Sequence, residues 1–85
     1  MKNEQDKLLL EELAKSIKNR RLQLGISQER LAEKCAFDRT YISMLERAKR
    51  NPSYLNLLKL CQGLDISLEE LLSKQGATYE KKNND

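Results

Sequence analysis

The chain has 85 residues, of which 39% are apolar, and it carries a formal net charge of +3. This length and composition suffice for one small hydrophobic core and exclude a second. The sequence contains no histidine, no glycine-rich phosphate loop and no visible nucleophile–base pair, and its two cysteines cannot by themselves build a tetrahedral metal site. We therefore expect no enzyme activity, no metal and no cofactor.

The N-terminal segment predicts neither a membrane anchor nor a signal peptide. It is charged before it becomes apolar, and no apolar run reaches the length of about 20 residues that spans a bilayer. We expect a soluble, cytoplasmic protein without a membrane partner.

Residues 8–24 predict the first helix. Their apolar residues recur at the three-to-four spacing of an amphipathic helix, and Gly25 is well placed as the left-handed residue that ends it. Arg21 interrupts the apolar stripe, four residues after Ile17. A charge in that position needs a partner.

Residues 28–47 predict a helix-turn-helix. Ser27 is a good N-cap for a short helix that ends at Cys35, and Asp38 is a good N-cap for a helix over 39–48. Ala36 stands at the bend, where many such motifs place glycine, so this bend can require a different backbone angle. The apolar residues expected to face inward are Leu31, Ala32, Cys35, Ile42 and Leu45.

The remaining sequence predicts two more helices and a polar tail. Ser53 precedes an amphipathic segment over 54–64, in which Gly63 is awkward for a helix, and Ser67 with Glu70 forms a capping box before the last helix. The predicted organisation is a leader with the start of the first helix (1–16), a helix-turn-helix domain (17–72) and a polar C-terminal tail (73–85), which is expected to fray or be disordered from Gln75 onward.

The charge is distributed unevenly along the chain. Residues 15–50 carry ten basic and four acidic residues, whereas residues 1–14 carry two and four and residues 51–85 carry four and five. A basic centre between acidic ends favours a polyanionic partner, although a chain with 34% charged residues also shows local excesses by chance.

The second helix of the motif carries side chains suited to reading DNA. The major groove, about 12 Å wide, admits one helix, and arginine can donate two hydrogen bonds to guanine. The residues predicted to contact bases are Arg39, Thr40, Ser43 and Met44. Those predicted to contact phosphates are Gln28, Tyr41, Arg47, Arg50 and Asn51. The alternative is a solvated basic face, with Tyr41 packed on the next helix and Met44 at the rim of the core.

Arg21 and Glu46 are predicted to form a structural ion pair. Arg21 lies on the apolar stripe of the first helix, and Glu46 follows the inward-facing Leu45. Both charges therefore lie at the edge of the core, where each can neutralise the other.

From about residue 17 to residue 72, the sequence resembles the Cro/C1-type helix-turn-helix family, also called the XRE family. The matching stretches are RRLQLGISQERLA, TYISMLER, RNPS and LDISLEELL. The resemblance implies an all-α fold, a five-helix lambda-repressor-like bundle whose members bind operator DNA as homodimers and regulate transcription. It also implies that Gln28 clamps a phosphate, that the four predicted base-contacting residues face the groove, and that Arg21 pairs with Glu46.

A narrower resemblance is to controller proteins of restriction–modification systems, carried by DRTYIS, the ER and RN pairs of residues 46–51, and NLLKLC. It implies regulation of the protein's own gene and of an endonuclease gene, with DNA contacts from residues matching Arg39, Thr40, Tyr41, Ser43 and Arg50. An antitoxin-type protein-binding module of the same fold is the alternative.

We expect a homodimer, because two recognition helices read two half-sites of a two-fold operator. Three apolar residues remain after the core is assigned and are the predicted interface: Leu55, Ile66 and Leu68. RNA polymerase is a further expected partner of such a regulator.

Overall fold

The computed structural model describes residues 3–73, and the predicted fraying of the C-terminal tail concerns residues outside this range. The described residues form five helices and no strand, which confirms the predicted all-α bundle. The helices are α1 (Glu4–Gln23), α2 (Gln28–Cys35), α3 (Arg39–Glu46), α4 (Tyr54–Gly63) and α5 (Leu68–Leu71). Among these residues, no helix has the length and apolar content needed to cross a bilayer.

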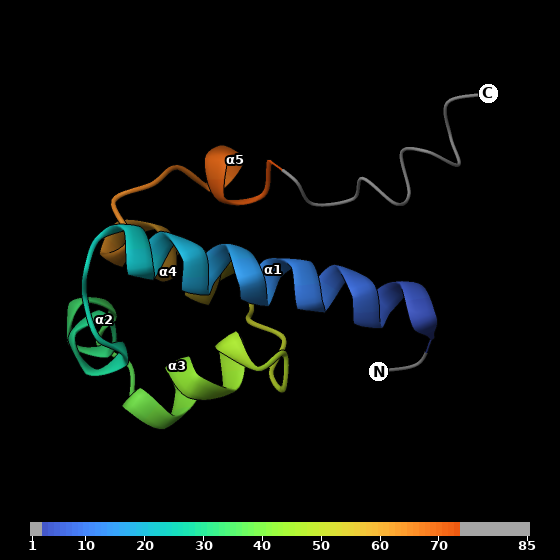
Figure 1. Ribbon diagram of the computed structural model, residues 1–85, viewed down its shortest axis with the longest axis horizontal. Helices are drawn as coiled ribbons and strands as arrows, with labels where there is room; N and C mark the ends of the chain where they lie inside the picture. The colour runs from blue at the N-terminus through green and yellow to red at the C-terminus, as the bar shows by residue number, and fades with distance from the viewer. Residues whose placement is uncertain (1–2, 74–85) are drawn as a thin grey trace.

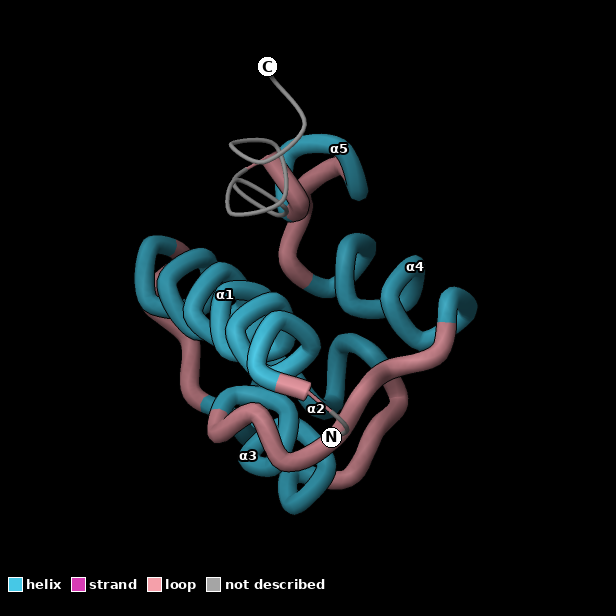
Figure 2. Tube along the Cα trace, turned by 90° about the vertical axis from the view of Figure 1, so that its right-hand side faces the viewer, coloured by secondary structure: helices cyan, strands magenta, loops and turns pink. Residues whose placement is uncertain are grey.

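The long α1 crosses the middle of the molecule (Figure 1). In this view α5 lies above it and α2 and α3 lie below it, while the end-on view separates α4 from α1 (Figure 2). The core between them contains six fully buried side chains: Ile17, Leu31, Ile42, Leu45, Leu60 and Leu64. Since these residues come from α1, α2, α3, α4 and the residue that caps α4, one core holds four of the helices together.

Serine side chains begin three of the helices, as predicted. Ser27, Ser53 and Ser67 each accept a hydrogen bond from the backbone N–H three residues later, and Glu70 completes the capping box with Ser67. The prediction for the start of α3 was confirmed in position only, and the prediction for the start of α1 was wrong. Asp38 occupies the N-cap of α3 but makes no cap hydrogen bond with its side chain, which lines the hollow described below. α1 begins one turn before residue 8, because Asn3 accepts a hydrogen bond from the N–H of Asp6 at 2.8 Å.

Left-handed residues end the first three helices. Gly25, with φ of 70°, follows α1 as predicted. Ala36 after α2 and Ala48 after α3 have φ of 60° and 59°, so the bend of the motif needs no different backbone angle when alanine replaces glycine. Lys49 donates its N–H to the carbonyl of Met44 at 2.8 Å. This bond closes α3 at Glu46, two residues before the predicted end.

Gly63 allows α4 to approach α2 closely. A Cβ atom at this position would lie 2.5 Å from Cys35 Sγ and 3.2 Å from Leu31 Cδ1. The glycine that is unfavourable for helix propensity is therefore required by packing.

Gly63→Ala is expected to lower the free energy of unfolding by about 1–3 kcal/mol, the usual cost of overpacking a core. Urea denaturation measures the change. The double variant Cys35→Ala/Gly63→Ala is expected to recover part of the loss, because it removes the sulfur atom that the new methyl group would meet. If Gly63→Ala instead stabilises the protein by about 1 kcal/mol, as helix propensity alone predicts, the packing argument is wrong.

Candidate nucleic-acid interface

A buried ion pair fixes the position of α3. Arg21 Nε lies 2.7 Å from Glu46 Oε2, and Arg21 Nη2 donates to Glu46 Oε1 at 3.0 Å. The two side chains are only 9% and 3% exposed. Arg21 Nη1 also donates to the carbonyl of Ile26 at 2.8 Å, and Gln28 Nε2 donates to Glu46 Oε1 at 3.1 Å. The predicted pair is thus part of a network that joins the end of α3 to the end of α1 and the start of α2.

The opposite face of α3 is open. Ile42 and Leu45 are buried, whereas Arg39, Thr40 and Arg47 are exposed. Ser43 and Met44, the other predicted base-contacting residues, are half-buried. The N-terminal turn of α3 therefore presents a guanidinium and a hydroxyl outward, at the end where the helix dipole is positive.

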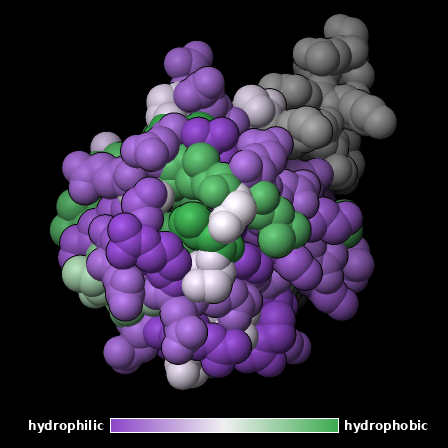
Figure 3. Space-filling view, turned by 60° about the vertical axis from the view of Figure 1, so that its left-hand side comes forward, coloured by the Kyte–Doolittle hydropathy of each residue, from purple (hydrophilic) through white to green (hydrophobic). Residues whose placement is uncertain are grey.

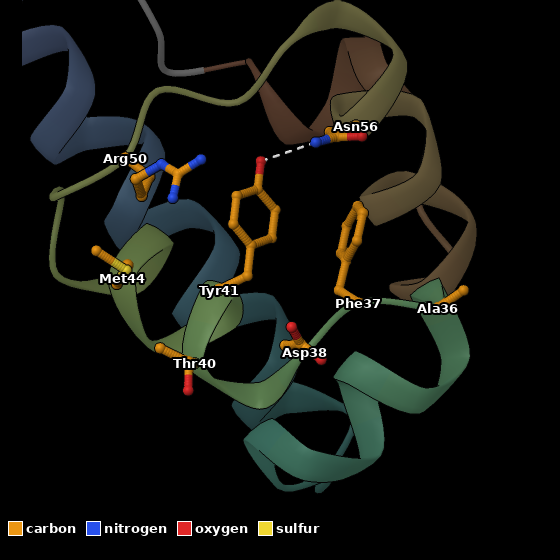
Figure 4. A pocket seen from close by; sticks show the side chains of 8 residues that line it. All are labelled: Ala36, Phe37, Asp38, Thr40, Tyr41, Met44, Arg50 and Asn56. Carbon is orange, nitrogen blue, oxygen red and sulfur yellow. Dashed lines mark hydrogen bonds between the residues drawn. The ribbon is translucent and has the colours of Figure 1, made fainter.

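A hollow of about 510 Å³ lies between α3 and α4 (Figure 4). Its lining residues are Ala36, Phe37, Asp38, Thr40, Tyr41, Met44, Arg50 and Asn56. The Tyr41 ring is its centre: Phe37 meets it edge-to-face with 4.9 Å between ring centroids, and Arg50 Cζ lies 5.2 Å from the ring centroid. Asn56 Nδ2 donates to the Tyr41 hydroxyl at 2.9 Å. Aromatic and cationic groups thus meet beside the open face of α3.

The predicted phosphate-contacting residues lie around these two features. Arg47 and Asn51 are exposed, and Arg47 Nε donates to the carbonyl of Ser43 at 3.3 Å. Gln28 uses one amide hydrogen for Glu46, which orients the amide and leaves its second hydrogen. Tyr41 packs against α4, the alternative considered from the sequence, yet its hydroxyl stays at the hollow.

Sequence reasoning missed Asn56 and Phe37. Neither has a local signal, because Asn56 is 15 residues from Tyr41 and lies on another helix. Phe37 gains its role only when the turn of the motif brings it against Tyr41. Contacts between residues of separate elements can be identified only when the structure shows how these elements pack.

The predicted dimer residues differ in their surroundings. Leu55 is 67% exposed and its neighbour Tyr54 is 65% exposed, at the start of α4. Ile66 and Leu68 instead pack partly against the core. Apolar side chains also gather in the middle of the face that carries the end of α1, surrounded by hydrophilic ones (Figure 3). Leu22, in the last turn of α1, is 56% exposed.

Residues 17–71 match the sequence model of a protein family that is described as helix-turn-helix. The chain belongs to the helix-turn-helix family. The resemblance seen in the sequence is thereby confirmed. Control protein C.MunI of Mycoplasma sp is 46% identical to this helix-turn-helix protein over 56 residues, which are 66% of this chain and 76% of the relative.

Two solved structures of restriction–modification controller proteins match this helix-turn-helix protein. C.AhdI from Aeromonas hydrophila is 40% identical, with a TM-score of 0.71 over 73% of this chain and 94% of the other. The C.Esp1396I tetramer in complex with its natural 35-base-pair operator contains a chain that is 42% identical. It gives a TM-score of 0.72 over 78% of this chain and 91% of the other.

The cysteines of this helix-turn-helix protein are packing residues. Cys35 and Cys61 are free and buried, and burial raises the pKa of both thiols. A raised pKa keeps a thiol protonated and unreactive at neutral pH. Within residues 3–73, no group of three histidine, cysteine, aspartate or glutamate side chains could hold a metal ion.

Proposed function

We propose that this helix-turn-helix protein is a restriction–modification controller protein, a transcription regulator that binds operator DNA upstream of its own gene and of an endonuclease gene. The observation that carries the proposal is the open polar face of α3, held in place from behind by the buried Arg21–Glu46 pair. A recognition helix needs both a free face and a rigid support. The control proteins among its relatives support the regulatory role.

α3 enters the major groove in this proposal. Arg39, Thr40, Ser43 and Met44 read base edges, with Arg39 donating to guanine. The groups that grip the backbone on either side are Gln28, Tyr41, Arg47, Arg50 and Asn51. Gln28 contacts a phosphate through its second amide hydrogen, the one that does not bind Glu46. A regulator of transcription works where the DNA is, which in a bacterial cell is the cytoplasm.

The protein acts as a homodimer in this proposal. The recognition helices of two subunits then read half-sites about 34–36 Å apart, one turn of DNA. Leu55 supports the assignment of the interface together with its neighbour Tyr54, because the two side chains are 67% and 65% exposed at the start of α4 and a second subunit would remove this apolar surface from water. Ile66 and Leu68 form the edge of that interface where the chain enters α5.

Leu55→Glu is expected to dissociate the dimer, because a carboxylate in an apolar interface loses its hydration without gaining a partner. Sedimentation equilibrium across a range of protein concentrations measures the change, with at least a tenfold rise expected in the dimer dissociation constant. Leu22→Glu is the matched control, since Leu22 is 56% exposed at the end of α1. If Leu22→Glu dissociates the dimer and Leu55→Glu does not, the interface lies on the α1 face.

Titration against the DNA upstream of the gene tests the function itself. The protein is expected to bind this fragment at least about 10³-fold more tightly than random DNA of equal length at physiological salt. Its footprint is expected to have two-fold symmetry. Equal, weak binding to both fragments would contradict the proposal.

The bound regulator is also proposed to contact RNA polymerase, because control at a promoter places the two side by side. Transcription in vitro with purified polymerase tests this contact. The expected result is a change in transcript level that requires the operator fragment.

A further inference from the structure

We propose that Asn56 of α4 is a positioning residue of the DNA interface. It holds Tyr41 so that the phenolic proton and the Arg50 guanidinium grip the same backbone phosphate. The inference rests on the proposed function and adds to it a residue on a helix that is not part of the helix-turn-helix motif.

The hydrogen bond between Asn56 and Tyr41 sets the direction of the phenolic proton. Asn56 Nδ2 donates to the Tyr41 oxygen at 2.9 Å, so the tyrosine acts as the acceptor. A phenol can donate one hydrogen bond as well as accept, and no described residue takes that proton. The hydroxyl therefore presents a donor to the hollow, where a phosphate oxygen can accept it.

The surroundings fix both the ring and the cation. Phe37 meets the Tyr41 ring edge-to-face at an interplanar angle of 68°, while Arg50 Cζ stands 5.2 Å from the ring centroid. Figure 4 shows the Tyr41 hydroxyl between the Arg50 guanidinium and the Asn56 amide, all on one side of the hollow. Asp38 lines the same hollow but lies at the other end of the ring, away from the hydroxyl.

The arrangement is suited to a phosphate because a neutral donor and a cation lie beside each other at the hollow. Hydrogen bonds to a charged oxygen are stronger than those between neutral groups. The cation–π contact holds Arg50, which would otherwise be free to move on an exposed connector. Asn56 contributes without touching DNA, since it fixes the rotamer and the proton of the residue that does.

A double-mutant cycle on DNA affinity tests this role. The variants are Asn56→Leu, which removes the amide at similar size, Tyr41→Phe, and the two combined. The probes are the operator fragment and a random duplex of equal length, followed by fluorescence anisotropy at fixed salt. Each single variant is expected to bind both probes about a hundredfold more weakly, because each of the two subunits loses one hydrogen bond to a charged group, worth about tenfold. The DNA affinity of the double variant is expected to fall no further than that of either single variant.

Asn56→Asp separates positioning from folding. Asn56 is the third residue of α4, where a carboxylate is favourable for the helix, so this variant is expected to fold. The carboxylate would take the Tyr41 proton, and affinity for both probes should fall at least as far as in Tyr41→Phe. Asn19→Leu is the matched control, because Asn19 is exposed beside the groove between α1 and α5. It should bind as the parent does.

Ethylation interference gives the readout that a purely structural role would not change. On the operator, ethylation of one phosphate in each half-site is expected to inhibit the parent strongly and to inhibit Asn56→Leu and Tyr41→Phe less, because in these variants only Arg50 still contacts that phosphate. Parental affinity in either Asn56 variant, or losses that multiply in the double variant, would overturn the role of Asn56. A parent that binds neither duplex would instead overturn the proposed function.

Discussion

Glu46→Ala is expected to lower the free energy of unfolding by about 3–5 kcal/mol, because it leaves the Arg21 guanidinium buried without its counter-ion. Arg21 is 9% exposed at the side chain and would keep only its hydrogen bond to the carbonyl of Ile26. A small domain has a total stability of roughly 5–15 kcal/mol, and one of this size lies near the lower end. The variant should therefore be partly unfolded at 25 °C, which far-ultraviolet circular dichroism measures in a urea titration.

Glu33→Ala is the matched control for this experiment. It breaks the ion pair with Arg30 on the surface of α2, whose side chains are 61% and 70% exposed at a separation of 3.1 Å. An exposed pair of this kind is worth about 0–1 kcal/mol. If the two variants lose equal stability, burial of the Arg21–Glu46 pair has no special role.

Replacing both partners separates the charge from the packing. Arg21→Met/Glu46→Leu removes the two charges together and fills a similar volume with apolar atoms. It is expected to recover most of the stability that Glu46→Ala loses. The cost of the single variant would then be the cost of an unpaired charge, as the geometry indicates.

Local chemistry explains why much of the fold was predictable. Each serine cap accepts a hydrogen bond from the N–H three residues later, and Gly25 adopts the left-handed conformation that follows α1. Each residue that predicts a helix end therefore lies within one helical turn of the backbone that it affects. The inward-facing set of the motif was predictable for the same reason, since Ile42 and Leu45 follow the helical repeat. Arg21 was informative because it broke that repeat.

The features that could not be predicted arise where separate elements meet. Gly63 appears unfavourable in its own helix, and only the distance to Cys35 on α2 explains it. The Asn56–Tyr41 bond joins two helices, and the Gln28–Glu46 bond spans 18 residues. The contact between Asn3 and Asp6 is local, but it lies before the first apolar residue of the stripe, where the repeat gives no signal.

Arg39→Ala is expected to cost about 1–3 kcal/mol at each half-site, or roughly 2–6 kcal/mol over a two-fold operator, because each guanidinium loses a paired hydrogen bond to guanine. Arg39 is exposed at the first turn of α3, and the loss should not disturb the core. The measurement is a comparison of anisotropy titrations on the operator, on random DNA, and on operators changed at single base pairs. The variant should lose its preference at one position in each half-site.

Arg47→Ala provides the contrast for Arg39→Ala. Arg47 is exposed at the other end of α3 and is assigned to the backbone, so its removal should weaken binding to all sequences equally and reduce the salt dependence. Each variant removes one positive charge, at opposite ends of α3. Any difference between them in base preference must therefore come from where the guanidinium lies in the groove. If Arg39→Ala weakens binding to the operator and to random DNA by the same factor, Arg39 contacts phosphate, and base reading would fall to Thr40, Ser43 and Met44.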